Sequence, residues 1–178
     1  MIKSRVKYSK RQTVRKNRAQ TEIEALFDSA DRYEEIRQFG KAFRCYRTAA
    51  LLGDQWGQVN LGNYYAAGKG VKRSLQKAAY WYRKAYHGGL ACGARNLAID
   101  RKNQGNARSA VQWFRRAAAM GDGESYVELA KIYKARRGGR SAAEAHLRQA
   151  LKLDEEQISE DAREQARALL DALRDVGR

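Results

Sequence analysis

The sequence predicts an all-α fold, a right-handed α-solenoid of about four helix–turn–helix repeats closed by a C-terminal capping helix. The 178 residues contain no proline, so the strongest helix breaker is absent. Ala, Leu, Arg, Lys and Glu, which favour helices, are abundant. A pattern of small and large apolar residues also recurs four times, at spacings of 36, 32 and 33 residues. Such a period is typical of repeat proteins built from helix pairs.

Each copy of the pattern has a large residue, with one alanine four positions before it and another three positions after it. Residues three or four apart lie on the same face of a helix, so each copy predicts a buried stripe with small flanks. Small flanks allow a neighbouring helix to approach closely. The large residues are Tyr46, Tyr82, Phe114 and Leu147; the preceding alanines are Ala42, Ala78, Ala110 and Ala143; the following ones are Ala49, Ala85, Ala117 and Ala150.

A second apolar pattern precedes each stripe and predicts the partner helix of each pair. It is clearest at Leu61-Gly62, Leu97-Ala98 and Leu129-Ala130, and it is looser around Leu26 and Ala30. Glycine can adopt the left-handed conformation that ends a helix. We therefore expect helices to end at three glycine-containing pairs: Gly53-Asp54, Gly88-Gly89 and Gly121-Asp122.

These residues resemble the tetratricopeptide repeat over roughly residues 21–153. The second unit has a longer turn and is similar to the Sel-one-like repeat, a relative of the same fold. Two departures are Arg101, where a core aromatic is expected, and Lys72, where proline is common. The positions that carry the Sel-one-like resemblance are Leu61, Gly62, Tyr65, Gly68, Gly70, Val71, Lys77, Ala78, Trp81, Tyr82, Lys84 and Ala85.

The C-terminal segment, residues 154–178, has the sequence pattern of a capping helix. Ser159 is a good N-cap residue, and Glu160 and Asp161 follow it in the first turn, where the helix dipole favours acids. One apolar stripe then faces the repeats while charges occupy the other face. The stripe comprises Ala162, Ala166, Leu169, Leu170 and Leu173.

The net charge of +16 is unevenly distributed and favours an acidic or phosphate-bearing partner. Residues 1–18 hold eight positive charges and no negative one, whereas the segment from Asp154 onward holds eight acids and four bases. We expect residues 1–20 to be a flexible basic arm, because few of them are apolar. The alternative is a solubilising tail. The eight cations are Lys3, Arg5, Lys7, Lys10, Arg11, Arg15, Lys16 and Arg18.

No pattern in the chain indicates catalysis, a cofactor or a metal. Gly62 and Gly68-Lys69 are six residues apart, not the five of a phosphate-binding loop, and Gly70 stands where Ser or Thr is required. Cys45 and Cys92 are isolated and have no zinc-site spacing. Trp81 and Trp113 are flanked by basic residues and could stack on nucleic acid, but their place in the repeat favours packing.

The resemblance implies a protein-interaction scaffold or adaptor, not an enzyme, that binds its partner on the concave surface formed by the first helix of each pair. An acidic protein is the expected partner; the alternative is an RNA-binding or ribonucleoprotein accessory factor.

The two cysteines are too few for a disulfide framework, which favours a cytoplasmic location. The alternative is import into mitochondria. We expect Tyr64 to be an exposed anchor. The full set of outward positions is Asn60, Asn63, Tyr64, Asn96, Asp100, Glu128, Lys131 and Ile132.

Overall fold

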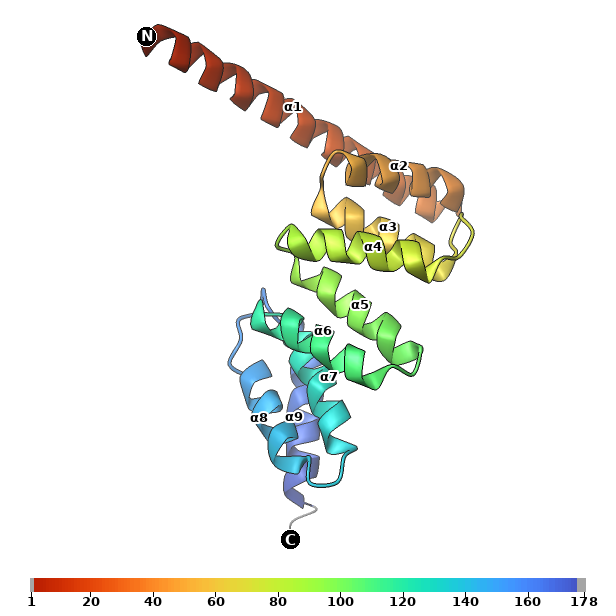
Figure 1. The fold of residues 1–178 in the computed structure, drawn as a ribbon, viewed down its shortest axis with the longest axis vertical. Coiled ribbons are helices and arrows are strands. Elements are labelled where there is room, and N and C mark those ends of the chain that lie inside the picture. The colour runs from red at the N-terminus through yellow and green to blue at the C-terminus, as the bar shows by residue number, and fades with distance from the viewer. Residues whose placement is uncertain (1, 176–178) are drawn as a thin grey trace. The chain divides into compact units, whose positions relative to one another are not determined.

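The computed structural model describes the backbone of residues 2–175 and the side chains of residues 18–174. This part of the chain contains nine helices and no strand, which confirms the predicted all-α repeat fold (Figure 1). Four consecutive helix pairs are followed by a single terminal helix, α9. The helices are α1 (Ile2–Glu35), α2 (Phe39–Leu51), α3 (Gln55–Ala67), α4 (Leu75–His87), α5 (Ala91–Asn103), α6 (Ala107–Ala119), α7 (Gly123–Lys134), α8 (Arg140–Ala150) and α9 (Glu160–Asp175).

The chain divides into two compact units, Met1–Lys84 and Ala85–Arg178. In the first unit α2 packs between α1 and α3. Its core joins Ala30 of α1, Ala42 and Tyr46 of α2, and Tyr64 of α3. The ring of Tyr46 meets the ring of Tyr64 edge to face, with 5.3 Å between their centroids. The small and large residues of the predicted stripe therefore interlock as expected.

The second unit has two adjoining cores. Phe114 and Leu129 centre the core of α5, α6 and α7. Leu147 and Ala166 belong to the core of α7, α8 and α9. The predicted small positions Ala42, Ala78, Ala110 and Ala143 have no exposed surface in either unit, so the register of the repeat is confirmed.

The longer turn between α3 and α4 requires glycine. Gly68 and Gly70 adopt φ values of 72° and 67°, in the left-handed region. A β-carbon on Gly70 would lie 2.5 Å from the carbonyl of Phe39, at the start of α2. The turn therefore packs directly against the preceding repeat, which explains the glycines of the Sel-one-like pattern.

Side-chain caps fix where two of the first helices, α3 and α7, and the terminal helix α9 begin. Asp54 accepts a hydrogen bond from the amide of Gly57 at 2.6 Å, and Asp122 accepts one from the amide of Ser125 at 3.0 Å. Ser159 caps α9, because its Oγ accepts from the amide of Ala162 at 3.4 Å. The predicted N-cap of the terminal helix is thus confirmed.

The N-terminal segment is the part of the chain that the sequence predicts to be a flexible basic arm, over residues 1–20. Residues 2–20 continue the backbone of α1, which is helical from Ile2. Arg, Lys and Gln have good helix propensity, and a helix satisfies its own backbone hydrogen bonds without a buried partner. No helix within the described residues is long and apolar enough to cross a bilayer.

Candidate interaction groove

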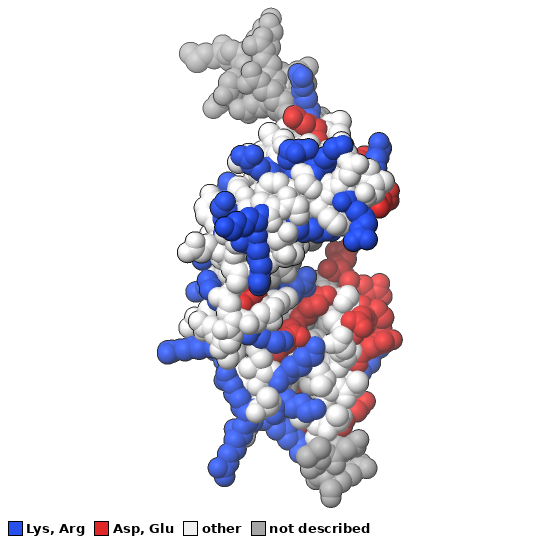
Figure 2. Space-filling view, turned by 90° about the vertical axis from the view of Figure 1, so that its right-hand side faces the viewer, with Lys and Arg blue, Asp and Glu red and all other residues white. Residues whose placement is uncertain are grey.

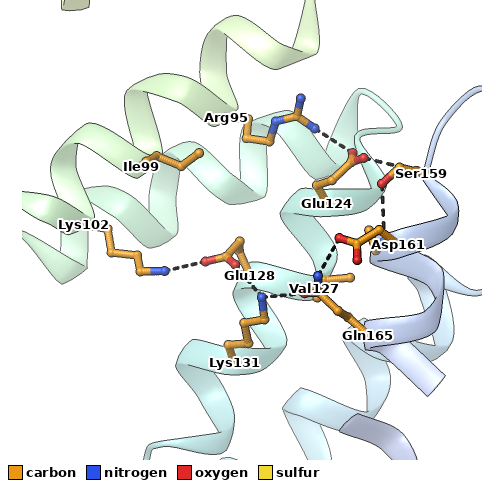
Figure 3. Close-up of a pocket in the computed structure, with 11 residues that line it drawn as sticks. Arg95, Ile99, Lys102, Glu124, Val127, Glu128, Lys131, Ser159, Asp161 and Gln165 are labelled. Atoms are coloured by element: carbon orange, nitrogen blue, oxygen red, sulfur yellow. Dashed lines mark hydrogen bonds and ion pairs between the residues drawn. The ribbon is translucent and has the colours of Figure 1, made fainter. Parts of the chain in front are cut away.

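Three helices of the second unit, α5, α7 and α9, surround a groove with a volume of about 400 Å³ (Figure 3). From α5 it is lined by Arg95, Ile99 and Lys102, which are spaced four and three residues apart and therefore share one helix face. The residues from α7 repeat this spacing. They are Glu124, Val127, Glu128 and Lys131, and Ser159, Asp161, Ala162 and Gln165 complete the lining from the start of α9.

The groove has apolar surface between charged side chains. Ile99 is 38% exposed, while Val127, which lines the groove from α7, is buried. Ala162 adds a small apolar surface from α9. Charged and amide side chains stand on either side of these residues (Figure 3). An apolar centre with a polar rim is the usual composition of a protein interface.

Arg95 connects α5 to the beginning of α7. Its Nη1 lies 2.8 Å from Oδ1 of Asp122 and 2.6 Å from Oε2 of Glu124. Burial raises the pKa of Asp122 above its usual value, even though the charge of Arg95 and the hydrogen bonds from Ser125 act against it. Glu124 in turn accepts a hydrogen bond from the backbone amide of Ser159 at 3.2 Å. The two ion pairs join α5 to α7, and the hydrogen bond from Ser159 joins α7 to the start of α9, at one end of the groove.

A second network centres on Glu128. Its carboxylate lies 2.6 Å from Nζ of Lys102 and 2.9 Å from Nζ of Lys131. Lys131 also donates to Gln165 at 2.9 Å, and Gln165 donates to Asp161 at 2.8 Å. Burial raises the pKa of Glu128, but the hydrogen bonds and charges of the two lysines lower it by more, so this pKa lies below its usual value.

Of the residues expected on the partner-binding face, the structure places Glu128 and Lys131 in this groove. Asn96, Asp100 and Ile132 are half-buried and do not line it, and Ile132 packs against the core of α5, α6 and α7. On α5, Arg95 and Ile99 line the groove, each one position before the expected Asn96 and Asp100. The signal in the sequence is the spacing of Arg95, Ile99 and Lys102 on either side of the buried Leu97.

In the first unit, the prediction that Tyr64 is an exposed anchor is wrong. Tyr64 is 4% exposed, and its hydroxyl donates a hydrogen bond to Glu34. It lies one turn beyond the buried Leu61, on the side of α3 that contacts Tyr46 and Phe43 of α2. The sequence marks Leu61 and Gly62 as core positions of the helix, but only packing shows that a second face is covered by the preceding repeat.

The other expected residues of the first unit lie nearer the surface. Asn60 is half-buried and Asn63 is exposed. The carbonyl of Asn63 accepts a hydrogen bond from the hydroxyl of Tyr82 at 2.8 Å. Of the basic arm, Arg18 is exposed. The seven other cations, Lys3, Arg5, Lys7, Lys10, Arg11, Arg15 and Lys16, lie outside the described side chains.

Comparison with known proteins agrees with the repeat assignment. The Sel1 repeat family model matches residues 33–54, 57–90 and 101–122. No match was found among curated protein sequences.

Three solved structures share the fold. A Sel1 repeat protein from Oxalobacter formigenes is 28% identical over 64% of this chain, with a TM-score of 0.52. The protective antigen c5321 of uropathogenic Escherichia coli, which displays an SLR fold, is 18% identical over 88%, with a TM-score of 0.63. MamA is 16% identical over 86%, with a TM-score of 0.56. The chain spans 49%, 38% and 87% of these three proteins respectively.

Proposed function

Because the chain carries Sel1 repeats, a fold that commonly mediates protein–protein interaction, we propose that it is a non-catalytic scaffold that binds a protein partner on its first helices. The observation that carries this proposal is the groove between α5, α7 and α9. Its volume of about 400 Å³ can receive one or two side chains of a partner segment. Ile99 offers the apolar surface that such an anchor needs.

The groove is lined by three cations and three acids, and its two lysines, Lys102 and Lys131, are where an acidic residue of a partner segment would bind. Lys102 and Lys131 expose 47% and 39% of their side chains, whereas Glu128 between them exposes only 19%. The cationic ends are therefore more accessible than the carboxylate that they share. The basic arm, residues 1–18, adds long-range attraction for the same kind of partner. Deleting it should weaken binding most at low salt, because exposed charges are screened by ions.

The test is to place a cation over the apolar centre of the groove. Ile99→Arg should abolish or strongly weaken capture of specific partners from a nuclease-treated extract, and it should lower the affinity of each purified partner. Ile36→Arg is the matched control, since Ile36 is 59% exposed in the turn between α1 and α2. Nuclease treatment removes proteins that are bridged by nucleic acid.

Equal helical content and equal melting temperatures of the two variants would show that both are folded. If Ile99→Arg then retains every partner at the strength of the unmodified chain, the groove is not the binding site. If both variants lose the partners equally, binding is not localised to the groove either. Loss with Ile99→Arg alone supports the proposal.

A further inference from the structure

The second helices of three repeats share a charge pattern that the groove does not use. Helices α2, α4 and α6 contain no acidic residue, and each contains three cations. The first helices α5 and α7, by contrast, mix acids with bases. The nine cations are Lys41, Arg44 and Arg47 in α2; Lys77, Arg83 and Lys84 in α4; and Arg108, Arg115 and Arg116 in α6.

All nine of these cations are exposed, and within the described part of the chain none of them forms an ion pair. In α8 and α9, by contrast, several arginines pair with acids on the same helix: Arg140 pairs with Glu144, and Arg174 pairs with Asp171. Figure 2 shows Lys and Arg spread widely over the surface in view, whereas much of the acidic surface is gathered together. The second helices therefore carry an uncompensated positive potential.

Aromatic rings position several of these cations. The guanidinium of Arg116 lies 4.2 Å from the ring centroid of Trp113, and Nζ of Lys84 lies 5.2 Å from that of Trp81. Nζ of Lys77 lies 5.2 Å from the ring of Tyr65. Side chains held over a ring lose less conformational freedom when they meet a ligand. The arrangement is therefore partly organised before any ligand binds.

We propose that the outer faces of α2, α4 and α6 bind single-stranded nucleic acid through its phosphate backbone. Six of the nine cations are arginines, whose planar guanidinium can donate two parallel hydrogen bonds to a phosphate. Each unit carries the pattern independently, because α2 lies in the first and α6 in the second. Tyr80 of α4, which is 54% exposed, presents a ring on which a base can stack.

An acidic protein is the less favoured ligand for the face of α6, although α2 and α4 do expose Leu51 and Tyr80. The exposed positions of α6 are Ala, Arg and Gln side chains only. A stable protein interface needs a buried apolar centre, which this face does not provide. A phosphate backbone has no such requirement, because its affinity for protein comes largely from release of counterions. This inference concerns a different surface from the groove, so either one can fail without the other.

The test uses the full chain and a fluorescein-labelled oligouridylate, with binding followed by anisotropy across a range of salt concentrations. The variant Arg44→Gln/Arg47→Gln/Arg108→Gln/Arg116→Gln removes four of the nine cations. The matched control Arg140→Gln/Arg148→Gln/Arg167→Gln/Arg174→Gln makes the same change in net charge at arginines that pair with acids.

The first variant should lower the affinity at least about tenfold at low salt. It should also reduce the slope of log affinity against log salt by up to about 2.8, from roughly 0.7 per neutralised phosphate. The control should change both quantities little. If circular dichroism shows that the fourfold variant is less folded, the double variant Arg44→Gln/Arg47→Gln is measured instead. Within the described residues neither of these side chains lies over an aromatic ring, so their replacement removes no packing of that kind. That pair should reduce the slope by up to about 1.4.

Three results would overturn the inference. The first is that the intact chain does not bind the oligonucleotide. The second is that the control loses as much affinity as the variant, because then only net charge matters. The third is that polyglutamate displaces the oligonucleotide at equal charge concentration and that its own binding depends on the same arginines, because then the faces recognise acidic protein.

Discussion

The ring of Tyr82 lies so close to Gly62 that a β-carbon at residue 62 would stand 2.5 Å from its Cε1. Gly62 is in the first helix of the second repeat, α3, and Tyr82 is the large residue of the stripe in its partner, α4. The two helices of this pair therefore approach at a glycine. Tyr82 is 3% exposed, so its ring has little room to move away.

Gly62→Ala should consequently destabilise the protein by about 1–3 kcal/mol through overpacking, although alanine is the better helix former. Gly40→Ala in α2 is the control, because a β-carbon there meets nothing closer than 3.8 Å. It should be neutral or slightly stabilising. Urea denaturation of both variants checks the difference, and a Gly62→Ala midpoint equal to that of the unmodified chain would contradict the close approach.

The alanines of the stripe should tolerate no larger side chain. Ala110 has no exposed surface, whereas Ala119 at the end of the same helix, α6, is exposed. Ala110→Gln should lower the free energy of unfolding by about 1–3 kcal/mol, because the core of α5, α6 and α7 must expand around it. Ala119→Gln should change it by less than about 0.5 kcal/mol. Equal denaturation midpoints for the two variants would refute the register.

Tyr64 should now behave as a core residue, not as a partner anchor. Tyr64→Ala should cost about 3–5 kcal/mol, as expected for loss of a buried aromatic side chain. Tyr64→Phe should cost less, about 1.5–3 kcal/mol, because it removes only the hydrogen bond to the charged Glu34. Glu34 keeps its ion pair with Lys69 at 3.1 Å in that variant. Thermal melting monitored by circular dichroism distinguishes the two, and an unchanged Tyr64→Ala melt would contradict the burial.

The charge network of the groove should make stability depend on pH. The folded pKa of Glu128 lies below its usual value of 4.5, so its ionised form stabilises the fold. That contribution is present above about pH 4.5 and is lost as the pH falls through the lower folded pKa. Glu128→Gln should therefore be less stable than the unmodified chain at pH 7, and the difference should shrink in acid.

Urea midpoints measured between pH 3 and 7 check this dependence. The control is Glu164→Gln, on an exposed position of α9, which should follow the unmodified chain throughout. If the difference in urea midpoint between Glu128→Gln and the unmodified chain stays constant from pH 3 to 7, the carboxylate charge does not stabilise the groove.

The sequence by itself determined the fold class, the four helix pairs and their register. The reason is local: alanines at fixed distances from Tyr46, Tyr82, Phe114 and Leu147 define one buried face, and helix periodicity needs no knowledge of distant contacts. The same applies to the N-cap at Ser159, whose hydrogen bond spans only three residues.

The exposed face of each first helix was decided by the tertiary structure alone. A first helix packs against its own partner and against the preceding repeat, so a second face is covered, and Tyr64 lies on it. The groove depends on α9, which brings Gln165 to within hydrogen-bonding distance of Lys131, 34 residues earlier. Periodicity within one helix carries no information about which distant helix packs on it, because that choice is made by the combined shape of all the packed side chains.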